Sequence, residues 1–372
     1  MTQTAAELIG KARRITVKVG SSLLVGDAEA RREWLASLGQ DLAALRAEGK
    51  QVVVVSSGAV ALGREHLGLK RSPRLDHKQA AAAAGQALLM QAWEGAVAPF
   101  GIPTAQLLLT IDDTEQRRRW LNARATMEVL LAQGALPVVN ENDSVATEEL
   151  RYGDNDRLSA RTAQMVRSDL LILLSDVDGL YTADPARNTG AEHIPFVAEA
   201  EAAEAFAGGS GQSGVGTGGM RTKVAAARIA SGFGCATIVA SGHEERPIAR
   251  LREGARATVF AARGTPGTAY KQWIAGTLAP AGSVTIDDGA VNALRSGRSL
   301  LPAGITSVAG SFERGVCLHV LDPHGREVAR GISAYTSAEA QAIIGCGSDA
   351  IEAKLGFAGP AELIHRDDMV ML

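Results

Sequence analysis

The sequence has few cysteines and no long apolar run. Its three cysteines, Cys235, Cys317 and Cys346, form no C-x-x-C pair. Neither a disulfide framework nor a zinc site is therefore expected, and the reducing cytoplasm is the predicted location. Residues 1–14 lack the apolar centre of a signal peptide, and no apolar run reaches the length of about 18 residues that a membrane helix needs. We expect a chain without membrane segments.

The sequence also lacks a strong excess of charge of either sign. The formal net charge is −3 and the calculated isoelectric point is about 6.2. A general attraction to nucleic acid or to anionic membranes is therefore not expected. The 372 residues, 46% of them hydrophobic, are enough for two domains with buried cores. Chemistry on small molecules is the favoured class of function.

Short apolar segments alternate with segments of helical spacing over about the first 260 residues. This alternation predicts a three-layer αβα sandwich with a mainly parallel sheet. The predicted strands are 15–19, 51–55, 104–109, 136–139, 170–174 and 236–240, and the predicted helices include 28–47, 78–97, 114–133 and 155–167.

Polar residues stand where several of these predicted strands end. In sheets of this kind, ligands bind outside the carboxyl ends of the strands, so the side chains are predicted to form one site. They are Lys18, Ser57, Asn140, Asp143, Ser175 and Asp176.

The alternation stops within residues 263–282, which are rich in glycine and proline. We predict a first domain over 1–270 and a small β-rich domain over 281–372, in which acidic residues outnumber basic ones. Its predicted strands are 283–286, 305–308, 316–321 and 328–333, with one short helix over 337–344.

A glycine-rich loop precedes another predicted helix. Seven of the twelve residues 208–219 are glycine, and the helix begins near Gly219 with Thr222 and Lys223 close behind. Backbone N–H groups of such a loop and the positive end of the helix can bind phosphate. The dinucleotide fingerprint and the Walker motif do not fit, because no strand precedes the loop and Val224 follows Lys223. A flexible linker is the alternative interpretation.

Lys18 and Lys223 are the candidate pair for phosphoryl transfer. Positive charge around the moving phosphoryl group is what this chemistry requires, and Asp176 is predicted to hold the lysines in place. Each residue alone also has an ordinary interpretation, a surface lysine or a turn aspartate.

Two clusters rich in Asn and Asp, 140–143 and 152–156, are candidates for substrate binding. Their side chains could bind the charged groups of a zwitterionic substrate, or they could only cap the local backbone. The Ser57-Gly58-Ala59 turn offers a hydroxyl and open N–H groups to a carboxylate.

Taken together, the motifs resemble those of the glutamate 5-kinases, within the amino-acid kinase family. The resemblance runs through the whole chain, and the segment from Ala281 is similar to a PUA domain. It implies ATP-dependent phosphorylation of the γ-carboxylate of L-glutamate, the first step of proline biosynthesis. The matching segments are 17–21, 56–59, 140–143, 153–156, 175–181 and 216–223.

The resemblance also implies roles for individual residues. By position, Ser57 with Gly58 and Ala59, Asp143 and Asn155 match the glutamate side. The ATP side is matched by Lys18, Ser175, Asp176, Thr217, Gly218, Gly219, Met220, Arg221, Thr222 and Lys223. Mg²⁺ is expected to be held mainly by the ATP phosphates. Feedback inhibition by proline, a homo-oligomer (dimer or tetramer) and an association with glutamyl-phosphate reductase are further implications.

Three alternatives stay open. The chain could be a kinase of the same fold for another small acid such as aspartate, N-acetylglutamate or UMP, against which the second domain argues. It could be an RNA-binding or RNA-modifying PUA protein, against which the acidic balance of 281–372 argues. It could be a catalytically silent regulatory subunit, but both lysines are present.

Overall fold

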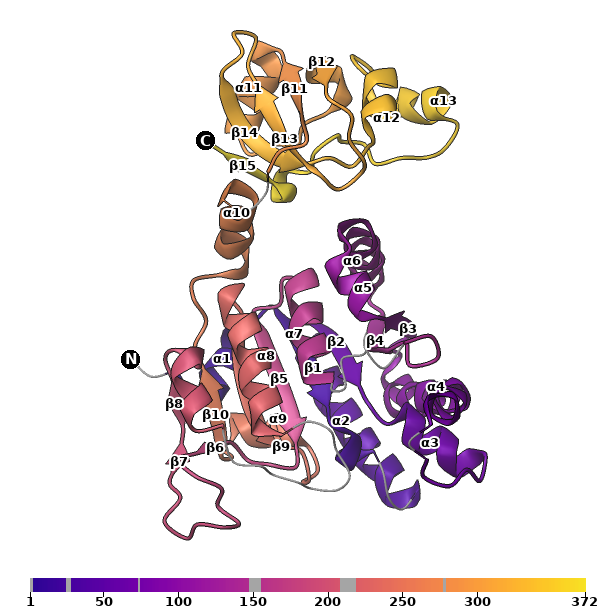
Figure 1. Cartoon of the computed structure of the whole chain (residues 1–372), viewed down its shortest axis with the longest axis vertical. Coiled ribbons are helices and arrows are strands. Elements are labelled where there is room, and N and C mark those ends of the chain that lie inside the picture. The colour runs from indigo at the N-terminus through magenta and orange to yellow at the C-terminus, as the bar shows by residue number, and fades with distance from the viewer. Residues whose placement is uncertain (1–2, 25–27, 73, 147–154, 208–218, 277–278) are drawn as a thin grey trace. The chain divides into compact units, whose positions relative to one another are not determined.

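The computed structural model describes residues 3–24, 28–72, 74–146, 155–207, 219–276 and 279–372 (Figure 1). Packing divides the chain into two compact units, Met1–Pro266 and Gly267–Leu372. The division falls inside the stretch 263–282 at which the sequence pattern changes. The domain limits of 270 and 281 stay a prediction.

An eight-stranded sheet forms the centre of the first unit. Its strands are β1 (Arg14–Val19), β2 (Gln51–Ser56), β3 (Thr104–Leu109), β4 (Leu136–Glu141), β5 (Leu170–Ser175), β8 (Phe196–Val197), β9 (Ala236–Ser241) and β10 (Ala257–Phe260). Their order is β3-β4-β2-β1-β5-β9-β10-β8, and only the β9–β10 pair is antiparallel among these neighbours. The mainly parallel sheet predicted from the sequence is confirmed.

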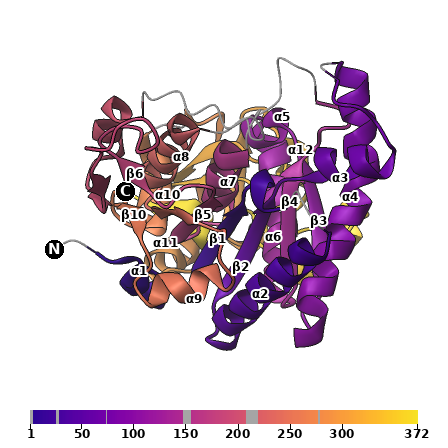
Figure 2. The same cartoon turned by 90° about the horizontal axis from the view of Figure 1, so that it is seen from below.

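Helices cover both faces of this sheet, as Figure 2 shows. They are α1 (Ala5–Lys11), α2 (Ala28–Ala47), α3 (Ala59–His66), α4 (Leu75–Val97), α5 (Ile111–Glu115), α6 (Arg117–Ala132), α7 (Asn155–Met165), α8 (Met220–Gly232) and α9 (Pro247–Arg252). Ile15 and Val17 of β1 share a buried cluster with Leu38 of α2, whereas Leu171 of β5 shares another with Ala227 of α8. Side chains of a strand alternate between faces, so Lys18 faces the α7 and α8 side.

One predicted helix, 114–133, is wrong in its extent. The structure has α5 and α6 instead, separated at Gln116, whose backbone is extended with φ −74° and ψ 114°. A capping box of Thr110 and Asp113 starts α5. The spacing of apolar residues does not reveal a helix break of a single residue. The apolar residues after the break continue at nearly the same helical spacing as those before it.

Helix α4 contacts two other helices through glycine. A Cβ atom on Gly85 of α4 would overlap the carbonyl of Ala59, and one on Gly63 of α3 would overlap that of Ala81. Near the other end of α4, a Cβ on Gly39 of α2 would overlap the carbonyl of Ala96. The backbones of α3 and α2 therefore lie directly against α4 at two separate places.

The second unit has its own core and its own sheet. Five strands, in the order β12-β11-β13-β14-β15, enclose a buried cluster that includes Leu318 and Tyr335. The strands are β11 (Gly282–Ile286), β12 (Ile305–Ala309), β13 (Cys317–Leu321), β14 (Glu327–Ile332) and β15 (Met369–Met371), and the helices are α11 (Asp288–Arg295), α12 (Ser337–Ala342) and α13 (Ile351–Leu355). The predicted β-rich second part is confirmed.

A helix that the sequence analysis did not predict, α10 (Pro266–Gly276), precedes this sheet. Arg330 of β14 donates a hydrogen bond to the carbonyl of Ala275 over 2.9 Å, which attaches the end of α10 to the second unit. Among the described residues of both units, no helix is both long enough and apolar enough to cross a lipid bilayer.

Candidate active site

Asn155, the first residue of α7, joins the carboxyl ends of β2 and β4. Its side-chain nitrogen lies 2.8 Å from the carbonyl oxygen of Ser56, 2.9 Å from Oγ of Ser57 and 2.9 Å from Oδ1 of Asn140. Parallel pairing of β2 with β4 places these strand ends side by side. Three residues predicted to share a site, Ser57, Asn140 and Asn155, are thus in direct contact.

The turn after Ser57 exposes the start of helix α3. Gly58 has φ 101°, a left-handed conformation that favours glycine, and it precedes Ala59 as the N-cap of the eight-residue helix. Gly58 has no side chain with which to cap the first N–H groups of α3. These donors, next to the Ser57 hydroxyl, form a site that can accept a carboxylate.

Asp143 is half-buried two residues beyond the end of β4. Asp143 therefore lies near the carboxyl end of a strand, the edge of the sheet at which the site was expected. Its role as a ligand of glutamate stays a prediction.

The next residue of α7, Asp156, belongs to a buried cluster of charged side chains. Asp156 lies between two lysines: Lys18 Nζ is 2.6 Å from its Oδ1, and Lys223 Nζ is 3.3 Å from its Oδ2. Thr222 donates a hydrogen bond to Oδ2 over 2.8 Å. The exposed fractions are 0% for Asp156, 7% for Lys18 and 3% for Lys223. Three elements, β1, α7 and α8, therefore meet at one carboxylate.

The surroundings of Asp156 keep it ionised. Burial by itself would raise the pKa of this carboxyl group, but the charges of Lys18 and Lys223 and the hydrogen bonds from Lys18 and Thr222 outweigh it. They hold the pKa of Asp156 well below its usual range. The cluster of two ammonium groups and one carboxylate carries a net charge of about +1, which suits a polyanionic ligand.

The sequence analysis gave the task of holding the lysines to Asp176, and it named Asp156 only as part of the cluster 152–156, a candidate for substrate binding. A signal for Asp156 was present, because Asp156, Ser159, Ala160 and Ala163 recur at the spacing of one helix face and all are buried. A carboxylate on the buried face of a helix requires a cationic or hydrogen-bonding partner.

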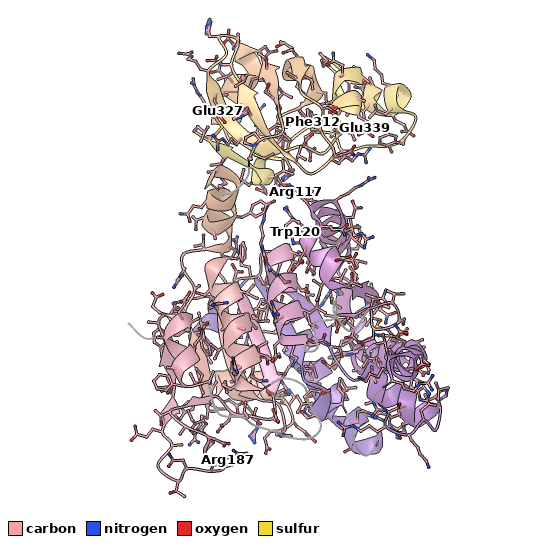
Figure 3. The ribbon with its side chains drawn as sticks, viewed as in Figure 1. Arg117, Trp120, Arg187, Phe312, Glu327 and Glu339 are labelled. Atoms are coloured by element: carbon pink, nitrogen blue, oxygen red, sulfur yellow. The ribbon has the colours of Figure 1, made fainter. Side chains whose placement is uncertain are left out.

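Asp176 lines a cavity of about 770 Å³ beside Lys223, and its role in holding the lysines stays a prediction. The hydroxyl of the buried Ser175 donates a hydrogen bond to Asp176 Oδ1 over 2.8 Å. The cavity extends from the end of β5 to the loop between the short strands β6 (Leu180–Tyr181) and β7 (His193–Ile194), where Figure 3 labels Arg187. Apolar lining comes from Leu180, Pro185, Ala186, Phe206 and Met220.

Helix α8 begins at the wall of this cavity. Gly219, its N-cap, and Met220 both line the cavity, and Gly219 has no side chain with which to cap the helix. The positive end of α8 and the Lys223 ammonium group thus lie together where the glycine-rich loop was expected to bind phosphate. Arg221 is exposed, and Thr217 and Gly218 lie outside the described residues.

Comparison with known proteins then identifies the family. Residues 13–241 match the amino acid kinase family, and residues 282–355 match the PUA domain. The chain belongs to the amino acid kinase family. A glutamate 5-kinase of Caulobacter vibrioides is 59% identical to this amino acid kinase over 378 residues, with 100% of both chains covered.

A glutamate 5-kinase of Paramagnetospirillum magneticum is 53% identical over 366 residues, which cover 98% of this amino acid kinase and 99% of the relative. Among solved structures, a carbamate kinase from Giardia lamblia bound to AMP-PNP has a TM-score of 0.50 and 13% identity, covering 68% of this chain and 99% of its own. At this low identity the likeness concerns the fold alone.

Proposed function

We propose that this amino acid kinase is a glutamate 5-kinase, which transfers the γ-phosphoryl group of ATP to the γ-carboxylate of L-glutamate. The full-length similarity to glutamate 5-kinases of two bacteria supports the assignment. The products are ADP and L-glutamyl 5-phosphate, the first intermediate of proline biosynthesis.

One observation carries the proposal on the structural side. Two consecutive residues at the start of α7 contact two different sets of side chains: Asn155 contacts the Ser57 turn, and Asp156 contacts Lys18 and Lys223. We assign the first set of contacts to glutamate and the second to the ATP phosphates. One turn of helix then holds acceptor and donor in a fixed relation, which is the main requirement of phosphoryl transfer.

On this assignment, Ser57, the N–H groups after Gly58, Asp143 and Asn155 bind glutamate. Lys18, Lys223 and the start of α8 bind the phosphates, and Ser175 and Asp176 border the nucleotide cavity. A volume of about 770 Å³ falls in the range of sites for small molecules and cofactors. The apolar residues of the cavity would contact the adenine base.

The reaction requires no general base. A glutamate side chain has an ordinary pKa of about 4.3, so an oxygen of its carboxylate is already a nucleophile at neutral pH. It forms a bond to the γ-phosphorus while the bond from that phosphorus to the β–γ bridging oxygen breaks, and ADP keeps the electron pair. The protein must reduce the repulsion between the two anions, and we assign this to Lys18, Lys223 and the helix N-terminus.

Mg²⁺ is proposed as the metal partner of ATP. Among the described residues, no group of three or more His, Cys, Asp or Glu side chains could hold a metal ion. We propose that the phosphate oxygens of ATP are its main ligands. Bound there, the ion would neutralise charge on the transferring group. We also propose a cytoplasmic homo-oligomer inhibited by proline, an association with glutamyl-phosphate reductase, and domains over 1–270 and 281–372.

A test of the function is ADP release measured with L-glutamate, L-aspartate, N-acetylglutamate, UMP and no acceptor. Of these acceptors, only L-glutamate should cause release of ADP. The product should be an acyl phosphate, which hydroxylamine converts to a hydroxamate. A Lys18→Ala variant is the control for contaminating kinases. Faster turnover with another acceptor would contradict the assignment.

A further inference from the structure

A second cavity, of about 690 Å³, lies between helices α2, α3 and α4. It shares no lining residue with the nucleotide cavity. Its apolar lining is Ala36, Leu62, Leu88, Ala92 and Ala96, its charged lining is Arg31, Arg32 and Glu65, and its polar lining includes Gln91 and His66. The volume again suits a small molecule.

The packing of the three helices keeps this cavity open. Helix α4 contacts the backbone of α3 at Gly85 and the backbone of α2 at Ala96, and its lining residues Leu88, Ala92 and Gly95 lie between these two contacts. Because backbone already touches backbone at both places, the helices cannot approach further to fill the space. A Cβ atom on Gly95 would meet no atom within 4 Å, so the space beside this glycine is empty of protein.

The charges at the rim favour an anion. Two arginines, Arg31 and Arg32, line the cavity against one carboxylate, that of Glu65. Arg31 lies 4.0 Å from Glu65, at the limit of an ion pair. Arg32 is exposed and forms no ion pair with another described residue. A guanidinium group offers two parallel N–H donors that match the two oxygens of a carboxylate.

A chain of contacts leads from the rim to the Ser57 turn. Arg31 Nη1 donates a hydrogen bond to the carbonyl of Leu24 over 3.2 Å. The Leu24 side chain in turn lies 3.2 Å from the position that a Cβ on Gly58 would take. Gly58 starts α3, which also supplies Leu62, Glu65 and His66 to the cavity. A ligand that attracts Arg31 or moves α3 would therefore shift the Ser57-Gly58 turn.

We propose that this cavity is a regulatory site for a small amphipathic carboxylate, whose apolar part contacts Leu62, Leu88 and Ala92 and whose carboxylate binds Arg31 and Arg32. Its occupancy changes the affinity for the acceptor acid through Leu24 and Gly58. This second step rests on the proposed function of the Ser57 turn.

The test uses octanoate as the probe and the full chain in titration calorimetry. Gly95→Leu should fill the cavity and Arg32→Glu should reverse a charge at its rim. Each should weaken octanoate binding by about tenfold or more, the effect expected for loss of a charged partner or of the space for the ligand. Two matched controls should bind octanoate as the wild type does. Gly10→Leu changes another exposed helical glycine, at which a Cβ would also meet no atom within 4 Å. Arg118→Glu changes another exposed arginine.

Two further readouts complete the test. Octylamine should bind at least about tenfold more weakly than octanoate, because the rim is positive. Saturating octanoate should change the KM of the acceptor acid, whichever acid the enzyme phosphorylates, and this change should be absent in Gly95→Leu.

Three results would overturn the proposal: no saturable binding of octanoate to the wild type, equal binding to Gly95→Leu, or binding that leaves the acceptor KM unchanged. A lower molar mass of Gly95→Leu in light scattering without ligand would also overturn it, because a second copy of the chain would then cover the cavity. Calorimetry does not depend on turnover, so failure to bind octanoate leaves the kinase assignment intact.

Discussion

Lys18 and Asp156 form a buried ion pair in which Nζ and Oδ1 are 2.6 Å apart. Lys18 lies on the central strand β1 and Asp156 in the first turn of α7, so the pair connects the sheet to the helix that also carries Asn155. Lys223 joins the same carboxylate from α8. The position of each ammonium group is therefore fixed by protein contacts before any phosphate binds.

Asp156→Asn should affect both catalysis and stability. The substitution keeps the shape of the side chain but leaves two buried lysines without their carboxylate. Breaking a buried pair in this way costs about 3–5 kcal/mol of unfolding free energy. Urea unfolding of the variant measures this loss, and kcat should fall steeply because the lysines are no longer held. Near wild-type kcat and stability together would show that the carboxylate is not needed to position them.

The stabilising effect of Asp156 should depend on pH in one direction. Its pKa is lowered in the folded protein, so its contribution is complete above the unfolded value of about 3.9 and is lost as the pH falls through the folded value. The difference in unfolding free energy between wild type and Asp156→Asn should thus be constant from pH 8 to 5 and shrink below about pH 4. A difference that changes between pH 6 and 8 would point to another titrating group.

Asn155→Ala should act mainly on the acceptor. The amide contacts Ser57 and Asn140 but none of the lysines in the described contacts. Loss of a hydrogen-bonding partner for a charged group costs about 1.5–3 kcal/mol, so the KM for glutamate should rise roughly ten- to a hundredfold. Steady-state kinetics should show the KM for ATP changed by much less. Asp143→Ala should behave in the same way, and equal effects on both substrates would indicate general damage to the fold.

Replacing either of two glycines of helix α4 by alanine should change the unfolding free energy, in opposite directions for the two positions. Gly85→Ala would place a methyl group on the carbonyl of Ala59 and should lower the unfolding free energy by about 1–3 kcal/mol or more. Gly95→Ala meets open space in the same helix and should raise it by about 0.5–1 kcal/mol. Chemical denaturation of both variants checks the pair. A stable Gly85→Ala variant would mean that α3 and α4 can separate at little cost.

Catalysis should survive removal of the second unit. All proposed site residues precede Ala240, so a chain ending at Pro266 should keep glutamate-dependent turnover. A chain ending at residue 280 should be less soluble, because it keeps α10, including the buried Tyr270 and Ile274, without the unit to which most of α10 belongs. ADP release and light scattering distinguish the two truncations. A folded but inactive 1–266 fragment would show that the second unit supports the active site.

The sheet could be predicted because its strands are buried on both faces and read as continuous apolar runs. Segments such as Gln51–Ser56 and Thr104–Leu109 were placed within one residue. Parallel pairing places the ends of β2 and β4 at one edge, where Ser57 and Asn140, two of the predicted strand-end residues, both contact Asn155 of α7. Helix α10 was missed because its sequence begins with Pro-Gly, which signals a turn as readily as a helix start.

The partner of the lysines could not be predicted in the same way. Asp156 and Lys18 are far apart in sequence, and their contact depends on how α7 packs on β1. Asp176 was the candidate that the motif offered, and its role stays a prediction; it is exposed at the cavity, whereas Asp156 is fully buried. A local sequence pattern predicts the helix or strand to which a residue belongs. A buried ion pair between two elements depends also on how those two elements pack against each other.

The central position of β1 has a consequence for the motion of Lys18. Its backbone lies opposite Val55 of β2 on one side and Leu173 of β5 on the other, so parallel ladders flank it on both sides. Amide hydrogens in such a place exchange with deuterated water only when most of the domain opens. The slowest-exchanging amides of the first unit should therefore include the segment Val17–Val19. The Lys18 ammonium group can then move only through its own side-chain torsions.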